Sequence, residues 1–289
     1  MRRINRHQCI TIMIAVCIAT YNQQAFIAQA IESVLAQQCD EPIRIYIGDD
    51  ASSDDTQAVC ERYAAKDPRI VYVRREHNLG LVANTIDLYR RIMADGCDYV
   101  AMLDGDDYWI DSHKLQLQVD YLRSHPECGF VHTAAYDEVE GARVDADYPD
   151  KPVGDISLRY NRQGASHTNC TVLFRAALLH DEDLNAIEQQ HFLVLDYPLY
   201  GLFSQYTRFG YIHTYTAVWR RHTSVSHARS LRAFMRYNYH YARAWYWLNK
   251  KHQGHFHFHW YSAILWYIWQ NFYFLFAQLK KKLYLCSRF

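Results

Sequence analysis

Short apolar segments alternate with amphipathic segments along the first half of the chain, and this alternation limits the possible folds more than any other feature. The apolar segments have the length and the Ile and Val content of buried strands. The segments between them carry apolar residues at helical spacing, such as Ile27, Ile31 and Val34. This order predicts an α/β fold in which helices cover both faces of a mostly parallel sheet. The expected strands are Thr11–Ile18, Arg44–Ile47, Ile70–Val73 and Tyr99–Leu103, and the expected helices are Gln24–Gln37, Thr56–Lys66 and Leu81–Ala94.

The second half of the chain mixes both elements less regularly. The 289 residues, 50% of them hydrophobic, suffice for a sizeable core and are many for one domain without an appendage. Asp137–Asp155 is predicted to be a surface loop or hairpin, and after about His227 the composition becomes aromatic and basic. We further expect a helix at Lys114–Ser124, strands at Phe130–Thr133 and Thr168–Arg175, an amphipathic helix within Phe192–Tyr206 and a strand at Arg208–Arg220.

Charge and cysteine usage narrow the function classes. The formal net charge is +0, so no overall positive charge indicates a nucleic-acid partner. The 8 cysteines are scattered without a C-x-x-C pair, which favours reduced thiols in the cytosol over a disulfide framework. The basic start and apolar run of MRRINRHQCITIMIAVCIA are compatible with a targeting segment, but the run is short for a membrane span and leads into polar residues. We interpret it as a buried first strand.

Polar, acid-rich stretches follow three of the predicted strands, at Thr20–Asn22, Asp49–Asp55 and Asp104–Asp107. In open parallel sheets, ligands bind beyond the carboxyl ends of the strands. Asp104 and Asp106 flank a glycine that permits a tight bend, and such carboxylates suit Mg²⁺ or Mn²⁺, which share substrate phosphates. A solvated loop that caps the next helix is the alternative, because D-x-D by itself is a weak motif.

Other nucleotide-binding motifs are absent from the sequence. It has no G-x-x-x-x-G-K-[ST] loop, which argues against a P-loop NTPase, and no G-x-G-x-x-G, which argues against a dinucleotide-binding fold. Phosphatases with an aspartate nucleophile place D-x-D after their first strand and before Thr or Val. Here the motif follows the fourth predicted strand and precedes Asp107 and Tyr108.

Four segments occur in a specific order: VCIATYNQQAFIAQAIESVLAQ, IGDDASSDDT, NLGLVANTIDLYR and VAMLDGDDYWIDSHKLQLQVDYL. Together they resemble the nucleotide-binding half of the family 2 glycosyltransferases, which have the GT-A fold. The similarity continues through HTNCTVLFR, VLDYPLY and WRRHTSVSH and covers about Thr11–His227. It implies a GT-A domain at 1–227, with a nucleotide-binding half at 1–110 and an acceptor half at 111–227. Residues 228–289 would form a helical, aromatic and basic extension.

The resemblance implies a role for each polar stretch. The loop after the first strand would lie against the base and diphosphate, and one of the paired acids after the second strand would accept a hydrogen bond from the base. In the third stretch, Asp106 would bind the metal, Asp104 would lie near the ribose and the metal waters, and Asp107 would support both. Helix capping and turn formation are the alternatives for the acids and amides after the second and third strands. The implied nucleotide-sugar-binding residues are Thr20, Tyr21, Asn22, Asp49, Asp50, Asn78, Asn84, Asp104 and Asp106.

The acceptor half contains the implied catalytic base, Asp196 in VLDYPLY. Many family members carry Glu-Asp here, whereas this chain has Leu195 before the acid. Capping of the following helix is the alternative for Asp196, because Asp is a good N-cap residue. The resemblance also implies that Arg220, Arg221 and His222 bind the leaving diphosphate, with His222 as a further metal ligand. Ordinary surface positions are the alternative for these three residues.

The C-terminal extension combines aromatic and basic residues. Trp260–Leu279 is about as long as a membrane span, but Gln and Asn residues interrupt it. We interpret it as a helix that lies at the membrane interface or packs on the domain, with Lys280–Lys282 favouring an anionic surface. A similar mixture predicts a helix at Ser230–Asn249. The histidines between 252 and 259 have no nearby Cys or acid and indicate a polar face rather than a zinc site.

The sequence therefore predicts a metal-dependent glycosyltransferase. As the resemblance implies, it would move a sugar from a nucleotide diphosphate sugar to an acceptor hydroxyl with inversion, using Mg²⁺ or Mn²⁺. A glycan or lipid-linked glycan is the expected acceptor, in cell-surface polysaccharide or lipopolysaccharide synthesis. The expected location is the cytoplasm, at the inner face of the cell membrane through peripheral contact by 228–289. Two alternatives stay open: a metal-dependent nucleotidyltransferase, and a non-catalytic membrane-associated scaffold of the same fold.

Overall fold

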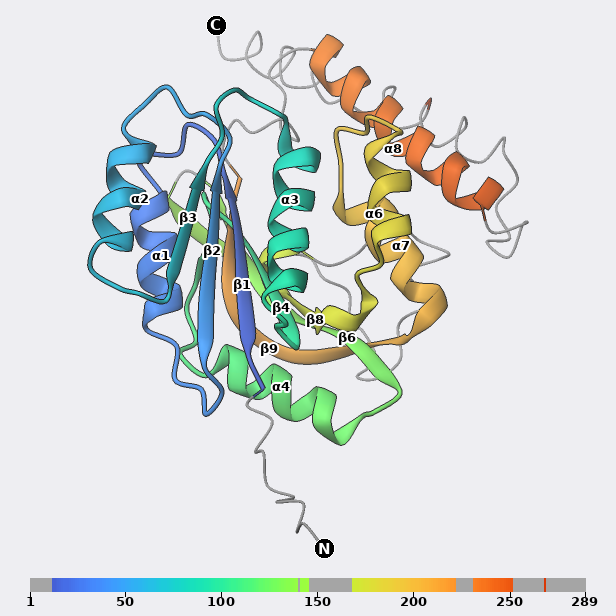
Figure 1. The fold of residues 1–289 in the computed structure, drawn as a ribbon. Coiled ribbons are helices and arrows are strands. Elements are labelled where there is room, and N and C mark those ends of the chain that lie inside the picture. Colours follow the sequence, from blue (N-terminus) through green and yellow to red (C-terminus); the bar gives the residue numbers. More distant parts are fainter. Residues whose placement is uncertain (1–11, 140, 146–167, 222–230, 252–267, 269–289) are drawn as a thin grey trace, which may run out of the picture.

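The computed structural model describes residues 12–139, 141–145, 168–221, 231–251 and 268, which form an α/β fold around a curled sheet (Figure 1). Among these residues the strand order is β3-β2-β1-β4-β8-β6-β9-β5, and β7 pairs with β6 outside this path. The predicted α/β architecture with a mostly parallel sheet is confirmed.

The first four strands form a parallel sheet. They are β1 (Ile14–Thr20), β2 (Ile43–Asp49), β3 (Ile70–Arg74) and β4 (Tyr99–Asp104). Their register places Thr20 opposite Asp49, and Ala19 opposite Asp104. β1, β2 and β4 therefore end at one edge of the sheet, and this edge carries the three polar stretches that the sequence places after strands.

Helices cover both faces of this sheet (Figure 1). The core on one face includes residues of α1 (Ile27–Leu35), α2 (Thr56–Ala64) and α4 (Lys114–Ser124). The core on the other face includes residues of α3 (Leu81–Ala94), α6 (Asp181–Glu188) and α7 (Asp196–Tyr206). Along β1, Ile14 and Val16 belong to the first core, whereas Ala15 and Cys17 belong to the second, and all four are fully buried. A strand buried on both faces has a continuous apolar sequence, as this one does.

The second half of the chain adds antiparallel strands. β8 (Val172–Arg175) lies antiparallel between β4 and β6 (Cys128–Val139), and it follows the 3-10 turn η1 (Asn169–Thr171) and precedes η2 (Ala176–Leu178). β9 (Arg208–Arg220) is parallel to β6 and antiparallel to the short β5 (Tyr108–Trp109).

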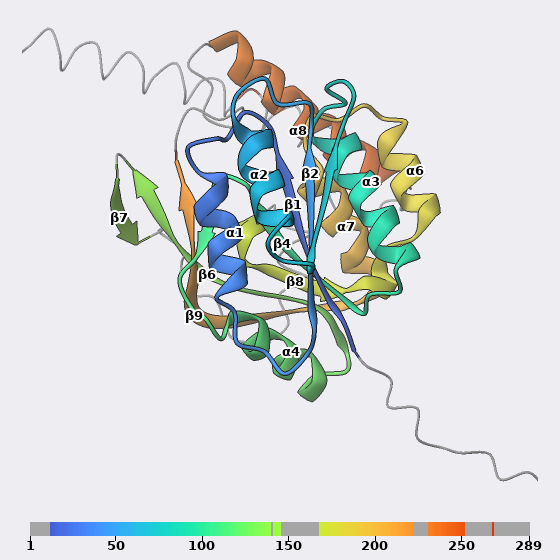
Figure 2. The same cartoon turned by 60° about the vertical axis from the view of Figure 1, so that its left-hand side comes forward.

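β6 is longer than the sequence predicts and forms a hairpin with β7 (Ala142–Asp145) (Figure 2). The predicted stretch Asp137–Asp155 therefore begins as a hairpin rather than as an irregular loop. Its remainder, 146–155, lies outside the described residues.

The helix predicted at Ser230–Asn249 is α8 (Leu231–Lys251), which packs on α7 (Figure 1). Ala244 and Leu248 are buried in the core that α8 shares with α3 and α7. Gly201 of α7 permits this approach, because a Cβ there would lie 2.5 Å from Leu248 Cδ1. Among the helices that the structure describes, none has the length and apolar character to cross a bilayer. Trp260–Leu279, Lys280–Lys282 and the histidines between 252 and 259 lie outside the described residues.

Candidate active site

The loop after β4 is held against the loop after β1. Gly105 donates its N–H to the carbonyl of Ala19 at 3.1 Å, and the Thr20 hydroxyl donates to Gln23 Oε1 at 2.7 Å. A Cβ at Gly105 would lie 2.9 Å from Thr20 Oγ1, so the close approach of the two loops requires glycine between the acids. Thr20 consequently lies beside the acidic loop, Asp104–Asp107, as the sequence predicts.

Burial and mutual repulsion raise the pKa of two of the three carboxylates in this loop. Burial and the charge of Asp106 raise the pKa of Asp104 to about 7, although a hydrogen bond from Asn169 opposes the shift. Burial and the charges of Asp106 and Asp104 also raise the pKa of Asp107. Hydrogen bonds from the Arg220 N–H to Asp107 Oδ1, at 2.9 Å, and from the Cys170 thiol to the same carboxylate oppose this shift without cancelling it. Such accumulated negative charge favours the binding of a cation.

Mg²⁺ or Mn²⁺ fits this set of oxygen donors. Both are hard cations that proteins commonly bind through one or two carboxylates together with substrate phosphates. Within the described ranges, no group of three or more His, Cys, Asp and Glu side chains could hold a metal ion by itself. Asp104 and Asp106 are the residues that would hold such an ion. His222, the predicted further ligand, lies outside the described residues.

Asp196 reaches the same site from the other half of the chain. It is the first residue of α7, and its Oδ1 accepts from the N–H of Tyr197 at 2.8 Å. The N-cap position belongs to Leu195, so Asp196 is not the N-cap that the alternative interpretation proposed. Burial raises the pKa of Asp196, and its charge contributes to the raised pKa of Asp104. The two carboxylates therefore lie close enough to interact.

Asp49 is fully buried at the end of β2. Its Oδ1 accepts from the N–H of Ser52 at 2.9 Å, and its Oδ2 accepts from the Tyr72 hydroxyl at 2.7 Å. Arg74 Nη1 also donates to Oδ2 at 3.1 Å. These contacts hold the loop after β2 against β3, and the role of Asp49 at a nucleotide base stays a prediction.

Asp50 and Asn78 together form the entry to α3. Asp50 accepts from the N–H groups of Leu79 and Gly80 at 2.7 and 2.9 Å. Asn78 Nδ2 donates to the carbonyl of Asp50 at 3.2 Å, and its Oδ1 accepts from Gly80 N–H at 3.1 Å. Both side chains thus have the turn-forming contacts of the alternative interpretation, at the same sheet edge as the acidic loop.

Asn84 points into the protein from α3 and is 1% exposed. Its Nδ2 donates to the carbonyl of Gly48 at 2.8 Å, and its Oδ1 accepts from Arg75 Nε at 2.8 Å. Arg75 Nη1 forms an ion pair with Asp87 Oδ2 at 2.6 Å. Asn84 therefore ties α3 to β2 and orients a largely buried arginine, and its contact with a nucleotide stays a prediction.

Tyr21 and Asn22 extend the site edge toward solvent. Asn22 adopts a positive φ of 52°, and its Oδ1 accepts from the N–H of Ser53 at 2.8 Å, which joins the loops after β1 and β2. Tyr21 is 47% exposed. An exposed aromatic ring at this edge is suited to lie against a base.

Arg220 and Arg221 bind acids and carbonyls of the protein itself. Arg220 Nη1 donates to the carbonyl of Asp106 at 2.8 Å, and its Nε donates to Glu138 Oε1 at 3.0 Å. The guanidinium also lies 4.4 Å from the ring centroid of Tyr108. Arg221 pairs with Asp137 at 2.5 Å. Arg220 thus supports the acidic loop from behind, and a contact of either arginine with a diphosphate stays a prediction.

Two residues at the site are missing from the sequence prediction. Asn169 Nδ2 donates to Asp104 Oδ1 at 3.1 Å, and the Tyr200 hydroxyl donates to Asn169 Oδ1 at 2.7 Å. The position of Asn169 depends on the antiparallel pairing of β8 with β4, and the residues near either strand do not predict this pairing. Tyr200 could have been found, because a residue four positions after Asp196 shares its helix face.

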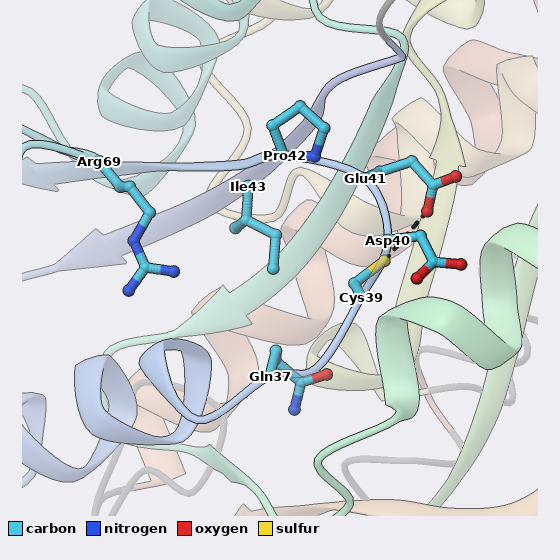
Figure 3. A pocket seen from close by; sticks show the side chains of 7 residues that line it. All are labelled: Gln37, Cys39, Asp40, Glu41, Pro42, Ile43 and Arg69. Atoms are coloured by element: carbon cyan, nitrogen blue, oxygen red, sulfur yellow. Dashed lines mark hydrogen bonds between the residues drawn. The ribbon is translucent and has the colours of Figure 1, made fainter.

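A hollow of about 400 Å³ lies elsewhere, at the amino end of β2 (Figure 3). Its lining is Gln37, Cys39, Asp40, Glu41, Pro42, Ile43 and Arg69. The acidic loop lies at the carboxyl ends of the strands, so this hollow is separate from the candidate active site.

Comparison with known proteins shows the family to which this chain belongs, and its fold is similar to that of GT-A glycosyltransferases. The profile described as "Glycosyl transferase family 2" matches residues 15–179, more than half of the 289-residue chain. The chain belongs to glycosyl transferase family 2, a family of glycosyltransferase enzymes.

Relatives and solved structures place this chain among proteins of the same family and fold. An uncharacterised protein of Mycobacterium tuberculosis is 35% identical over 131 residues, which are 45% of this chain and 37% of that protein. The dTDP-rhamnosyl transferase RfbG of Shigella flexneri is 31% identical over 106 residues, 36% of each protein. The match thus spans little more than a third of the length of either relative.

Two solved structures share the fold. S. aureus TarS in complex with UDP-GlcNAc has a TM-score of 0.58 at 16% identity, covering 79% of this chain and 66% of that chain. The mannosyltransferase PcManGT from Pyrobaculum calidifontis, in complex with GDP-Man and Mn²⁺, has a TM-score of 0.55 at 15% identity, covering 80% of this chain and 62% of that chain.

Proposed function

We propose that this protein transfers a sugar from a nucleoside diphosphate sugar to an acceptor hydroxyl, with inversion of the anomeric centre and with Mg²⁺ or Mn²⁺. The observation that carries the proposal is that Asp196, the first residue of α7, interacts with Asp104 at the carboxyl end of β4, and that Tyr200 of the same helix reaches Asp104 through Asn169. The proposal gains support from the structural neighbours, whose complexes contain UDP-GlcNAc, or GDP-Man with Mn²⁺.

In the proposed reaction, Asp196 accepts the proton of the acceptor hydroxyl while the acceptor oxygen forms a bond to the anomeric carbon. The bond from that carbon to the diphosphate oxygen breaks, and the nucleoside diphosphate leaves with the electron pair. The raised pKa of Asp196 makes it a stronger base than an ordinary aspartate. Asp104 and Asp106 would hold the metal ion, which supplies positive charge next to the leaving diphosphate.

The loops after β1 and β2 would offer further contacts to the nucleotide of the sugar donor. Tyr21 would lie against the base, and the backbone groups of the loops after β1 and β2 would surround the diphosphate. Asp49 and Asp50 would limit the choice of base through their buried carboxylates. His222 would be a further metal ligand next to Arg220 and Arg221.

The acceptor is proposed to be a glycan or lipid-linked glycan at the inner face of the cell membrane, in cell-surface polysaccharide or lipopolysaccharide synthesis. Support comes from α8, which exposes Arg232, Arg236 and Tyr239 at helical spacing on one side. The measurement is co-sedimentation with phosphatidylglycerol vesicles, where replacing both arginines with glutamate should abolish binding. Binding that survives this charge reversal would contradict membrane contact through α8.

The central experiment screens nucleotide sugars for Mn²⁺-dependent hydrolysis and then measures transfer by variants. We expect Asp106→Ala and Asp196→Ala to lower the rate by at least about 100-fold while the circular dichroism spectrum is unchanged. Asp181→Ala is the matched control, because Asp181 is also the first residue of a helix but lies in α6. Near-normal turnover by Asp196→Ala would show that another group is the base.

Product analysis separates the proposal from the nucleotidyltransferase alternative. A glycosyltransferase releases a nucleoside diphosphate from its donor, whereas a nucleotidyltransferase releases pyrophosphate from a nucleoside triphosphate. A protein that binds neither UDP nor GDP in the presence of Mn²⁺ would instead support the non-catalytic scaffold.

A further inference from the structure

A chain of two hydrogen bonds connects the helix of the proposed base to the acidic loop. The Tyr200 hydroxyl in α7 donates to Asn169 Oδ1 at 2.7 Å. Asn169 Nδ2 in η1 then donates to Asp104 Oδ1 at 3.1 Å. The three side chains come from elements that lie far apart in the sequence, and each bond lies within ordinary hydrogen-bond distance.

The direction of these bonds follows from the chemistry of the groups. An ionised carboxylate only accepts hydrogen bonds, so the amide nitrogen of Asn169 must face Asp104. The amide oxygen then faces Tyr200 and requires a donor, which the phenol hydroxyl supplies. Removing the Tyr200 hydroxyl would therefore leave the amide oxygen without its donor and free the amide to rotate away from Asp104.

Both supporting residues are held firmly by their surroundings. Next to Asn169, the carbonyl of Cys170 accepts from Trp109 Nε1 at 2.8 Å, and the Thr171 hydroxyl donates to the carbonyl of Thr168 at 2.6 Å. Tyr200 is 1% exposed, with its ring centroid 5.0 Å from that of Phe130. A rigid partner can fix the orientation of a carboxylate, whereas a mobile surface amide cannot.

Tyr200 lies four residues after Asp196 in α7, so both side chains lie on the same face of the helix. The hydrogen-bond chain therefore links the helix that carries the proposed base to Asp104, one of the two proposed metal ligands. We propose that Asn169 and Tyr200 are positioning residues that orient Asp104 for binding of the metal–diphosphate group and set its place relative to Asp196. This inference rests on the proposed function of the same site.

The test is calorimetric titration with UDP and with GDP, each at a series of Mn²⁺ concentrations. For the nucleotide that the wild-type protein binds, we expect Asn169→Ala to raise the half-saturating Mn²⁺ concentration by about tenfold or more, as loss of a hydrogen-bond partner behind a metal ligand does. Tyr200→Phe should raise it by about three- to fivefold, because the Asn169 amide loses the hydrogen bond that keeps its nitrogen turned toward Asp104. In the double variant the Tyr200→Phe change should add nothing, since it acts through Asn169.

Tyr206→Phe is the matched control. The Tyr206 hydroxyl in the same helix donates to Asp183 Oδ2 at 2.7 Å, away from the acidic loop. It should leave the half-saturating Mn²⁺ concentration unchanged, and because Tyr206 is 48% exposed it should lower the melting temperature no more than Tyr200→Phe does. A merely structural role for Tyr200 would lower the melting temperature of Tyr200→Phe without changing its half-saturating Mn²⁺ concentration.

Two outcomes overturn the inference, and they differ in what else they overturn. If the wild-type protein binds a nucleotide with Mn²⁺ and Tyr200→Phe binds it equally well, the inference is wrong and the proposed function stands. If the wild-type protein binds neither UDP nor GDP, the titration is repeated with dTDP, and a protein that binds none of the three overturns the proposed function and the inference with it. Because Tyr200→Phe keeps the packed ring, the test does not depend on whether Asn169→Ala folds.

Discussion

Replacing Arg220 with methionine tests whether a buried arginine holds the acidic loop. The Arg220 side chain is 10% exposed and that of its partner Glu138 is 19% exposed. Methionine keeps the stem packed beside Tyr108 but removes the donors to the Asp106 carbonyl and to Glu138. Breaking a buried ion pair costs about 3–5 kcal/mol, and since Glu138 keeps some solvent and the Tyr108 hydroxyl, we expect about 2–3 kcal/mol here.

Thermal unfolding measures this loss, which corresponds to a decrease in melting temperature of about 4–10 °C for a chain of this length. Arg69→Met is the matched control, because Arg69 pairs with Asp67 at 2.7 Å but its side chain is 41% exposed. Removing such a surface pair should cost about 0–1 kcal/mol. Arg220→Met should also raise the Mn²⁺ concentration that half-saturates nucleotide binding, since the backbone of Asp106 loses its support. A melting temperature within about 1 °C of wild type, with an unchanged Mn²⁺ requirement, would refute the reasoning.

Three further predictions follow from the packing. Gly105→Ala should destabilise the protein by about 1–3 kcal/mol and abolish metal-dependent binding, because its Cβ would lie 2.9 Å from Thr20 Oγ1. Gly129→Ala, whose Cβ would lie 2.8 Å from another threonine hydroxyl, should lower the melting temperature similarly but spare binding. Gly201→Ala should destabilise by about 1–3 kcal/mol by pushing α8 from α7, and an unchanged urea midpoint would contradict this packing.

Burial lowers the pKa of Lys114 from its ordinary value of 10.5 to about 7. Between these two pH values, Lys114 is mostly protonated in the unfolded chain and mostly neutral in the folded one. Stability should therefore rise with pH through this window, by about 2 kcal/mol from pH 7 to 9, and Lys114→Met should remove this part of the rise in urea denaturation. Parallel stability–pH curves for wild type and Lys114→Met would contradict this assignment.

Residue patterns along the chain are enough to predict the elements that depend on local causes. The apolar run of β1 indicates a strand buried on both faces, and the apolar spacing in Leu81–Ala94 gives α3 with the bounds found in the structure. The position of the D-G-D acids at the sheet edge also follows from the order of the elements along the chain, because parallel strands have their carboxyl ends at the same edge. Resemblance to a family then connected Asp196 with this edge across a long stretch of chain.

The contacts between polar side chains, in contrast, could be found only in the tertiary structure. Asn169 reaches Asp104 because β8 pairs antiparallel with β4, and such a non-local pairing leaves no trace in the spacing of residues near either strand. The same holds for Arg220: the sequence supplies a long cationic side chain at the end of β9, but the acceptors around it come from the acidic loop and from β6. A local pattern records what one element must bury, whereas the partners of a polar side chain depend on elements that folding brings together.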